Sequence, residues 1–167
     1  MKKLLTELPF GLAGTIYRSP LPFSPVYDPK GELIDAYKEA GIAVVVMLTP
    51  IEDVIRMTGM DLKARYHNLG LGVIYAPIED FSTPERGDMR LPIEQTLAAA
   101  QAGENIVIHC HAGIGRTGLF VACLARVIWE QSADEAVDWV RQYIPYAVEN
   151  EAQMTFIRDF EVPGGQV

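Results

Sequence analysis

The feature that most constrains the fold is the segment 116–131, RTGLFVACLARVIWEQ, which has helical length and is apolar almost all round. A helix of this kind is buried at the centre of a protein or embedded in a membrane. Its strongly apolar run, residues 119–125, is too short to cross a bilayer. The sequence therefore predicts a buried central helix that other elements cover on all sides.

Several apolar, β-branched segments are expected to form a sheet beside this helix. Residues 42–48, IAVVVML, and 105–109, NIVIH, are typical of strands buried on both faces. Residues 72–76 predict another strand, and residues 14–17 a short edge strand before the proline-rich loop 18–31. Turn and capping residues bound further runs that have helical spacing. The predicted helices are 32–40, 51–57, 62–69, 91–102, 116–131, 133–143 and 151–160.

This order of elements predicts an α/β fold. Residues 1–167 fit one domain. The alternation of strands and helices predicts three layers, α-β-α, around a central, mainly parallel twisted sheet of four or five strands. Active sites in such sheets lie beyond the carboxyl ends of the strands. Cys110 lies at such an end, where a strand passes through a loop into the central helix.

The connecting segment HCHAGIGRTG, residues 109–118, has three interpretations that we set aside. A plain strand–turn–helix connection with an inert cysteine leaves Arg116 unexplained, because a cation at the start of a helix opposes the helix dipole. A metal site would need spaced ligands, whereas His109, Cys110 and His111 are direct neighbours. A nucleotide-binding loop would need glycine in place of Cys110 and lysine in place of Arg116.

A fourth interpretation, an oxyanion-binding loop with a nucleophile beneath it, accounts for the whole segment. The backbone N–H groups of residues 111–115 can cradle a tetrahedral anion, and Arg116 offers a planar fork to two phosphate oxygens. Cys110 would be the nucleophile, with its thiolate stabilised by the helix N-terminus and the Thr117 hydroxyl. The expected phosphate contacts are His111, Ala112, Gly113, Ile114, Gly115 and Arg116.

The pattern His109-Cys110, five residues, then Arg116-Thr117-Gly118 resembles the signature of cysteine-dependent protein phosphatases. It matches HC-x-x-G-x-x-R-[ST]-G with no departure, and the likeness extends over residues 14–160. The resemblance implies a phosphomonoester hydrolase that acts on protein phosphotyrosine, phosphoserine or phosphothreonine through a phosphocysteine intermediate, without metal or cofactor. The compact length suggests the dual-specificity branch.

The segment YAPIEDFSTPE, residues 75–85, resembles the general-acid loop of that family, in which an aspartate precedes a proline. Asp80 matches the position of the acid, while Glu79 is a rival and Asp88 a remote one. An aspartate among Ser, Thr and Pro can also serve only to cap a loop. The resemblance favours Asp80 as the proton donor.

The segment AVENEAQ, residues 147–153, resembles the family segment that orients water for hydrolysis of the phosphocysteine. Gln153 matches a glutamine of that segment, whereas Glu149 stands where several members carry another glutamine. Gln153 could instead complete a capping box with Asn150, and both interpretations stay open. The segments PIEDFSTP and AVENEAQ are also similar to those of cyclin-dependent kinase-associated phosphatases, from which no kinase partner follows.

The net charge and the composition of the chain disfavour some classes of binding partner and cellular compartment. The net charge of −8 disfavours nucleic acid and anionic membranes as partners. The N-terminus begins like a signal peptide, but Glu7 and Pro9 interrupt the apolar run. Two cysteines make no disulfide framework, so we expect a cytoplasmic protein with free thiols. The expected protein is a monomer whose partner is a phosphorylated protein or a small phosphomonoester.

Three alternative functions would use a phosphate-binding loop of the same kind. Phosphoinositide and inositol-phosphate phosphatases of the family tend to carry lysines where this chain has His111 and Ile114. An RNA 5′-phosphatase is disfavoured by the acidic charge. A phosphate-binding module without turnover would not need Cys110, Arg116 and Asp80 together. The physiological substrate, and the preference between phosphotyrosine and phosphoserine or phosphothreonine, stay open.

Overall fold

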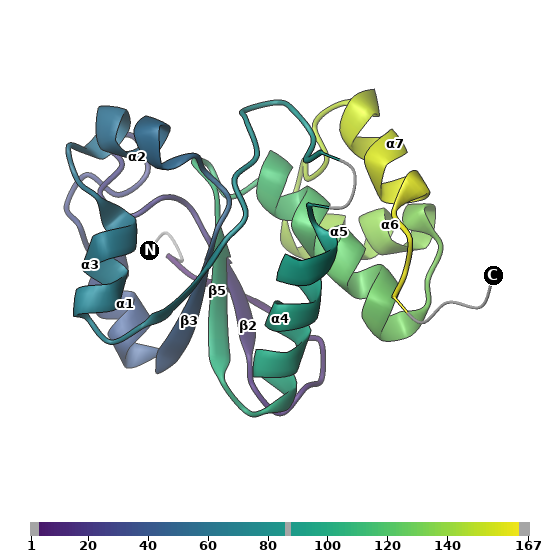
Figure 1. Cartoon of the computed structure of the whole chain (residues 1–167), viewed down its shortest axis with the longest axis horizontal. Helices are drawn as coiled ribbons and strands as arrows, with labels where there is room; N and C mark the ends of the chain where they lie inside the picture. Colours follow the sequence, from purple (N-terminus) through teal and green to yellow (C-terminus); the bar gives the residue numbers. More distant parts are fainter. Residues whose placement is uncertain (1–3, 86–87, 164–167) are drawn as a thin grey trace.

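A five-stranded sheet forms the middle of the computed structural model, which describes residues 4–85 and 88–163 (Figure 1). The strand order is β1-β2-β5-β3-β4; β1 runs antiparallel to β2, and the other neighbours are parallel. The mainly parallel sheet predicted from the sequence is therefore confirmed. The strands are β1 (Thr6–Leu8), β2 (Ile16–Ser19), β3 (Ile42–Met47), β4 (Gly72–Tyr75) and β5 (Asn105–His109).

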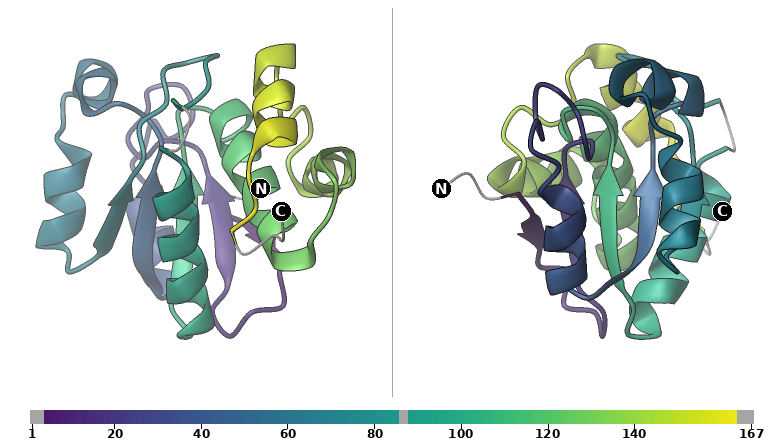
Figure 2. Two further views of the ribbon diagram at one scale, coloured as in Figure 1. Left: turned by 45° about the vertical axis from the view of Figure 1, so that its right-hand side comes forward. Right: turned by 90° about the vertical axis from the view of Figure 1, so that its left-hand side faces the viewer.

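Helices cover both faces of this sheet, as the two further views show (Figure 2). Along β3, Val44 and Val46 pack into one core, whereas Val45 and Met47 pack into the other. This alternation is the period of two of a strand that is buried on both faces, and it confirms the predicted three layers. One core takes side chains from α1 (Leu33–Glu39), α2 (Ile51–Thr58) and α3 (Leu62–Asn68). The other takes them from α4 (Arg90–Gln101), α5 (Gly115–Trp129), α6 (Ala133–Tyr143) and α7 (Glu151–Asp159).

The helix α5 lies inside the second layer of helices, with α4, α6 and α7 around it (Figure 1). Every residue from Gly115 to Ala125 is buried, so the prediction of a central helix is confirmed. Within residues 4–85 and 88–163, no helix combines the length and apolar character needed to cross a membrane. The N-terminus of α5 points to the carboxyl end of the sheet, where the candidate site lies.

Capping residues set the helix boundaries as predicted. Asp61 accepts a hydrogen bond from the Ala64 N–H, and Ser132 and Glu135 form a complete capping box. Asn150 accepts from the Gln153 N–H at the start of α7. These bonds satisfy N–H groups that have no partner inside the helix.

The N-terminal edge of the sheet differs from the prediction. The segment 14–17, predicted as an edge strand, corresponds to β2, which begins at Ile16 rather than at Gly14, because the Gly14 N–H donates to the Ala100 carbonyl at the end of α4 instead of to a strand. The prediction of an edge position is wrong, because β1 and β5 pair with β2 on its two sides. The strand β1 was not predicted at all. It has three residues, of which only Leu8 is buried, so the sequence carries no alternating pattern there.

Candidate active site

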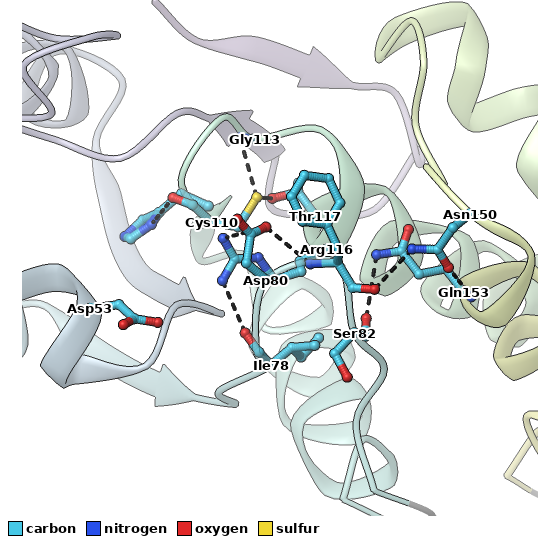
Figure 3. A network of polar contacts seen from close by, with 12 residues as sticks. Asp53, Ile78, Asp80, Ser82, Cys110, Gly113, Arg116, Thr117, Asn150 and Gln153 are labelled. Atoms are coloured by element: carbon cyan, nitrogen blue, oxygen red, sulfur yellow. Dashed lines mark hydrogen bonds and ion pairs between the residues drawn. The ribbon is translucent and has the colours of Figure 1, made fainter. Parts of the chain in front are cut away.

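Cys110 directly follows β5 and lies at the base of the loop that leads into α5 (Figure 3). Its Sγ accepts hydrogen bonds from the Gly113 N–H, with N···S at 3.2 Å, and from the Thr117 hydroxyl, with O···S at 3.1 Å. Both donors stabilise negative charge on sulfur, as the N-terminus of α5 does. The Cys110 sulfur thus lies beside two hydrogen-bond donors and the N-terminus of α5.

The loop above Cys110 requires glycine at position 113. Gly113 has φ +74°, and a Cβ atom there would collide with the Ser19 carbonyl at the end of β2. The Leu21 N–H also donates to the His111 carbonyl at 2.8 Å. The segment that leaves β2 therefore packs directly on the loop and fixes its shape.

Arg116 joins this loop to the segment that was predicted to carry the acid. Its guanidinium donates to the Ile78 carbonyl at 3.0 Å and pairs with the Asp80 carboxylate at 3.3 Å (Figure 3). The Arg116 side chain is only 4% exposed, whereas that of Asp80 is 57% exposed. The ion pair explains why a cation can stand at the positive end of a buried helix.

The acid candidates differ in their positions. Asp80 reaches Arg116, and its Oδ1 also accepts from the Phe81 N–H at 3.1 Å. Glu79 and Asp88 are exposed, and in the described part of the chain neither forms an ion pair with Arg116. The structure thus brings Asp80, rather than its rivals, to the loop that holds Cys110.

Gln153 lies in the first turn of α7 and is fully buried, with its side chain between Glu149 and Ser82. Its Oε1 accepts from the Glu149 N–H at 2.8 Å, and its Nε2 donates to the Ser82 carbonyl at 3.4 Å. A capping box would have used the Asn150 N–H, so that interpretation is wrong in detail: the side chain bonds the residue before the cap. The buried position is compatible with the water-orienting role, which stays a prediction.

Glu149 contributes a second carboxylate at the mouth of the loop. A Cβ atom on Gly115 would collide with its Oε2, so the carboxylate lies against the start of α5. Burial raises the pKa of Glu149, and the negative charge of Asp80 raises it further, whereas Arg116 opposes the shift. The sequence had marked this residue only as a departure from the family pattern.

Buried polar contacts beneath the loop were not foreseen from the sequence. The Tyr66 hydroxyl lies 2.8 Å from His109 Nε2, and His109 Nδ1 lies 3.3 Å from the Cys110 carbonyl oxygen. Burial lowers the pKa of His109 to about 4. The charge of Arg116 lowers this pKa as well, whereas the contact with the Cys110 carbonyl raises it. His109 is therefore neutral near pH 7 and contacts the main chain of Cys110.

We predict that His109 makes stability depend on pH. The pKa of His109 is about 4 in the folded chain and ordinarily 6.5. Between these two pH values the imidazole binds a proton in the unfolded chain but not in the native chain. Stability is then full above pH 6.5 and falls as the pH drops toward 4, by about 3 kcal/mol in total. Urea unfolding of the wild type and His109→Gln across this range measures the difference. Identical pH dependence in both proteins would contradict the prediction.

Comparison with known proteins agrees with this geometry. Residues 27–131 match a sequence family described as "Polymorphic toxin system, DSP-PTPase phosphatase". The chain belongs to this phosphatase family. The matched range includes Asp80, Cys110 and Arg116 but ends before Glu149 and Gln153.

Individual relatives include one protein named for a phosphatase domain and one named as a kinase inhibitor. The chain is 34% identical over 70 residues to protein tyrosine phosphatase domain-containing protein 1 of Danio rerio, a match of 42% of this chain and 10% of that protein. It is 25% identical over 125 residues to cyclin-dependent kinase inhibitor 3 of Rattus norvegicus, covering 74% of this chain and 59% of that protein. The chain thus spans about a tenth of the length of the first of these relatives.

Solved phosphatase structures share the fold. A crystal structure of kinase-associated phosphatase with its catalytic cysteine replaced by serine superimposes with a TM-score of 0.86 at 20% identity, covering 93% of this chain and 92% of that one. The active form of the phosphatase Tk-PTP superimposes with a TM-score of 0.76 at 22% identity, covering 95% and 97%. The resemblance to dual-specificity and kinase-associated phosphatases is confirmed.

Proposed function

We propose that this chain hydrolyses phosphomonoesters of proteins, on tyrosine, serine or threonine, through a phosphocysteine intermediate. The observation that carries the proposal is the meeting of three groups in one place. The Cys110 sulfur accepts bonds from the loop and from Thr117, while Asp80 reaches the same loop through Arg116. Nucleophile, anion-binding loop and acid are the parts that such a displacement needs.

In the first step, the Cys110 thiolate attacks phosphorus in line with the ester oxygen. The S–P bond forms as the P–O bond breaks, and Asp80 gives its proton to the leaving oxygen. The N–H groups of residues 111–115 and the Arg116 guanidinium stabilise the equatorial oxygens. The charge on these oxygens is balanced by the protein, so we propose that no metal or cofactor is needed.

Because Asp80 is paired with Arg116, we propose that substrate binding precedes proton donation in this step. A bound phosphate competes for the guanidinium, so Asp80 exchanges Arg116 for an anionic neighbour. Substrate binding therefore releases the Asp80 carboxyl from Arg116.

In the second step, water attacks phosphorus and the S–P bond breaks, which releases inorganic phosphate and restores the thiolate. Asp80, now a carboxylate, accepts the proton from water. On the α7 side, the Gln153 side chain holds the main chain of Glu149, whose carboxylate lies against the start of α5. We propose that Gln153 orients this water.

The charges at the mouth favour a singly phosphorylated group over a polyphosphate. Asp80 and Glu149 both lie beside Arg116, so further phosphates on an inositol ring would meet carboxylates rather than cations. This disfavours inositol phosphates and phosphoinositides as substrates. We further propose that the protein acts as a monomer in the cytoplasm.

The proposal is tested by turnover of a panel of phosphotyrosine, phosphoserine and phosphothreonine peptides and inositol phosphates, in EDTA. We expect hydrolysis of phosphopeptides and inhibition by vanadate, which resembles the five-coordinate transition state. Binding of phosphate analogues without turnover of any compound would indicate a phosphate-binding module instead. Preferential turnover of inositol phosphates would show that these compounds, rather than phosphoproteins, are the substrate class.

Oxidation is expected to inactivate the enzyme at Cys110 alone. Cys110 and Cys123 are both free, and burial inside α5 raises the pKa of the Cys123 thiol, which keeps it unreactive. The Cys110 sulfur contacts Thr117 in the first turn of α5, and Cys123 lies about 9 Å further along this helix. A disulfide needs Cα atoms within about 7 Å of each other. Peptide mapping after peroxide treatment should find Cys110 oxidised and Cys123 intact. A disulfide between them would refute the prediction.

A further inference from the structure

The backbone directly after Asp80 adopts an unusual conformation. Phe81 has φ +57°, the left-handed region that residues with a side chain rarely occupy. Such a conformation persists only where the surrounding structure holds it. Its own N–H donates to the Asp80 carboxylate at 3.1 Å, and its carbonyl accepts from Asn150 Nδ2 at 2.9 Å.

We infer that Asn150 is a positioning residue that holds the loop of the general acid against the site. The inference rests on the proposed function, in which Asp80 supplies the proton. Asn150 itself touches neither Cys110 nor Arg116 in the described contacts, so it acts through the Phe81 main chain. Figure 3 shows it on the α7 side of the loop.

The side-chain amide of Asn150 forms two hydrogen bonds, one to each of two segments. Asn150 Oδ1 accepts from the Gln153 N–H at 2.9 Å and so caps α7, while its Nδ2 donates to the Phe81 carbonyl, also at 2.9 Å. The two partners fix the orientation of the amide, because a flipped amide would face a donor with its NH₂ and a carbonyl with its oxygen. The start of α7 and the acid loop are therefore tied together.

The loop is fixed on both sides of Asp80. Before it, the Ile78 carbonyl accepts from Arg116 at 3.0 Å. After it, Asn150 holds Phe81, and the remaining bond from α7, from Gln153 to the Ser82 carbonyl, is longer at 3.4 Å. Without the Asn150 donor, Phe81 can return to negative φ, which rotates the peptide next to Asp80 and takes the carboxyl away from the site.

The two functions of Asn150 can be separated by substitution. Asp and Ser cap helices about as well as Asn, but neither can donate from this position as the amide does: Asn150→Asp has no proton to give, and Asn150→Ser is too short. The serine variant is the neutral control, because the aspartate adds a charge near Asp80 and Glu149. Asn150→Ala loses the cap as well and shows what destabilisation alone does.

The experiment measures turnover of aryl phosphates whose leaving groups span a wide range of acidity, together with thermal unfolding. For Asn150→Asp and Asn150→Ser we expect an unfolding temperature close to that of the wild type. We expect about tenfold slower turnover of phosphotyrosine, as for loss of one hydrogen bond that positions the acid. With a highly acidic phenol as leaving group, which needs little protonation, the loss should almost vanish.

Two results would overturn the inference: an equal loss for all leaving groups, or no loss for any of them while the wild type turns over. If Asn150→Asp fails to fold, Asn150→Ser decides the question by the same criteria. A wild type that hydrolyses none of the esters would instead refute the proposed function, so the two failures are distinguishable.

Discussion

Replacing Cys110 with serine is expected to reduce turnover of phosphomonoesters by about 10⁴-fold or more, as when other enzymes lose their nucleophile. A serine hydroxyl is hardly ionised near pH 7, so it does not attack phosphorus as a thiolate does. The fold should persist, because serine is similar in size and can accept the same bonds from the Gly113 N–H and Thr117.

The same variant should still bind phosphate analogues, since the binding groups are the backbone of the loop and Arg116. Calorimetric titration with tungstate, beside steady-state turnover, measures both properties in one preparation. Activity at the wild-type level in Cys110→Ser would contradict the mechanism. Loss of tungstate binding together with activity would show that the substitution had disrupted the loop itself.

Replacing Asp80 with asparagine is expected to slow phosphopeptide turnover by about 10²–10⁴-fold, the usual contribution of a positioned acid. Tyrosine phenoxide is a poor leaving group and needs the proton, whereas a nitro-substituted or halogenated phenol leaves with little help. The loss should therefore shrink as the leaving group becomes more acidic. The basic-side limb of the pH profile should also weaken, because asparagine has no proton to lose.

Glu79→Gln is the matched control for this substitution. Glu79 precedes Asp80 in the chain and is exposed, but only Asp80 of the two is paired with Arg116. Single-turnover rates with a series of aryl phosphates should be nearly unchanged in Glu79→Gln. A larger graded loss in Glu79→Gln, or an equal loss across the whole series in Asp80→Asn, would move the acid role away from Asp80.

Much of the fold could be predicted because the sequence expresses it locally. The run from Leu119 to Ala125 is apolar on all sides and is buried on all sides. The caps at Asp61, Ser132 and Asn150 lie three residues from their partners, within reach of sequence patterns. The strand β1 escaped prediction because three residues with one buried side chain leave no period to detect.

In the candidate site, too, local features could be predicted from the sequence and long-range contacts could not. Cys110, Thr117 and Arg116 lie in one short segment, so their spacing could indicate a phosphate loop. The contact of Asn150 with Phe81 spans 69 residues, and that of Tyr66 with His109 spans 43. No local pattern reports such pairs, because tertiary folding alone brings them together. Asn150 could thus be predicted as a cap but not as a partner of the acid loop.

The central claim is that phosphate passes through the Cys110 sulfur. Its most direct test is an acid quench in the millisecond range during turnover of a phosphopeptide, followed by mass spectrometry of the intact protein and its peptides. We expect a transient species that carries one phosphoryl group on the peptide with Cys110, and no such species in Cys110→Ser. Continued turnover with no phosphorylated protein, or with the phosphoryl group on another residue, would contradict the account.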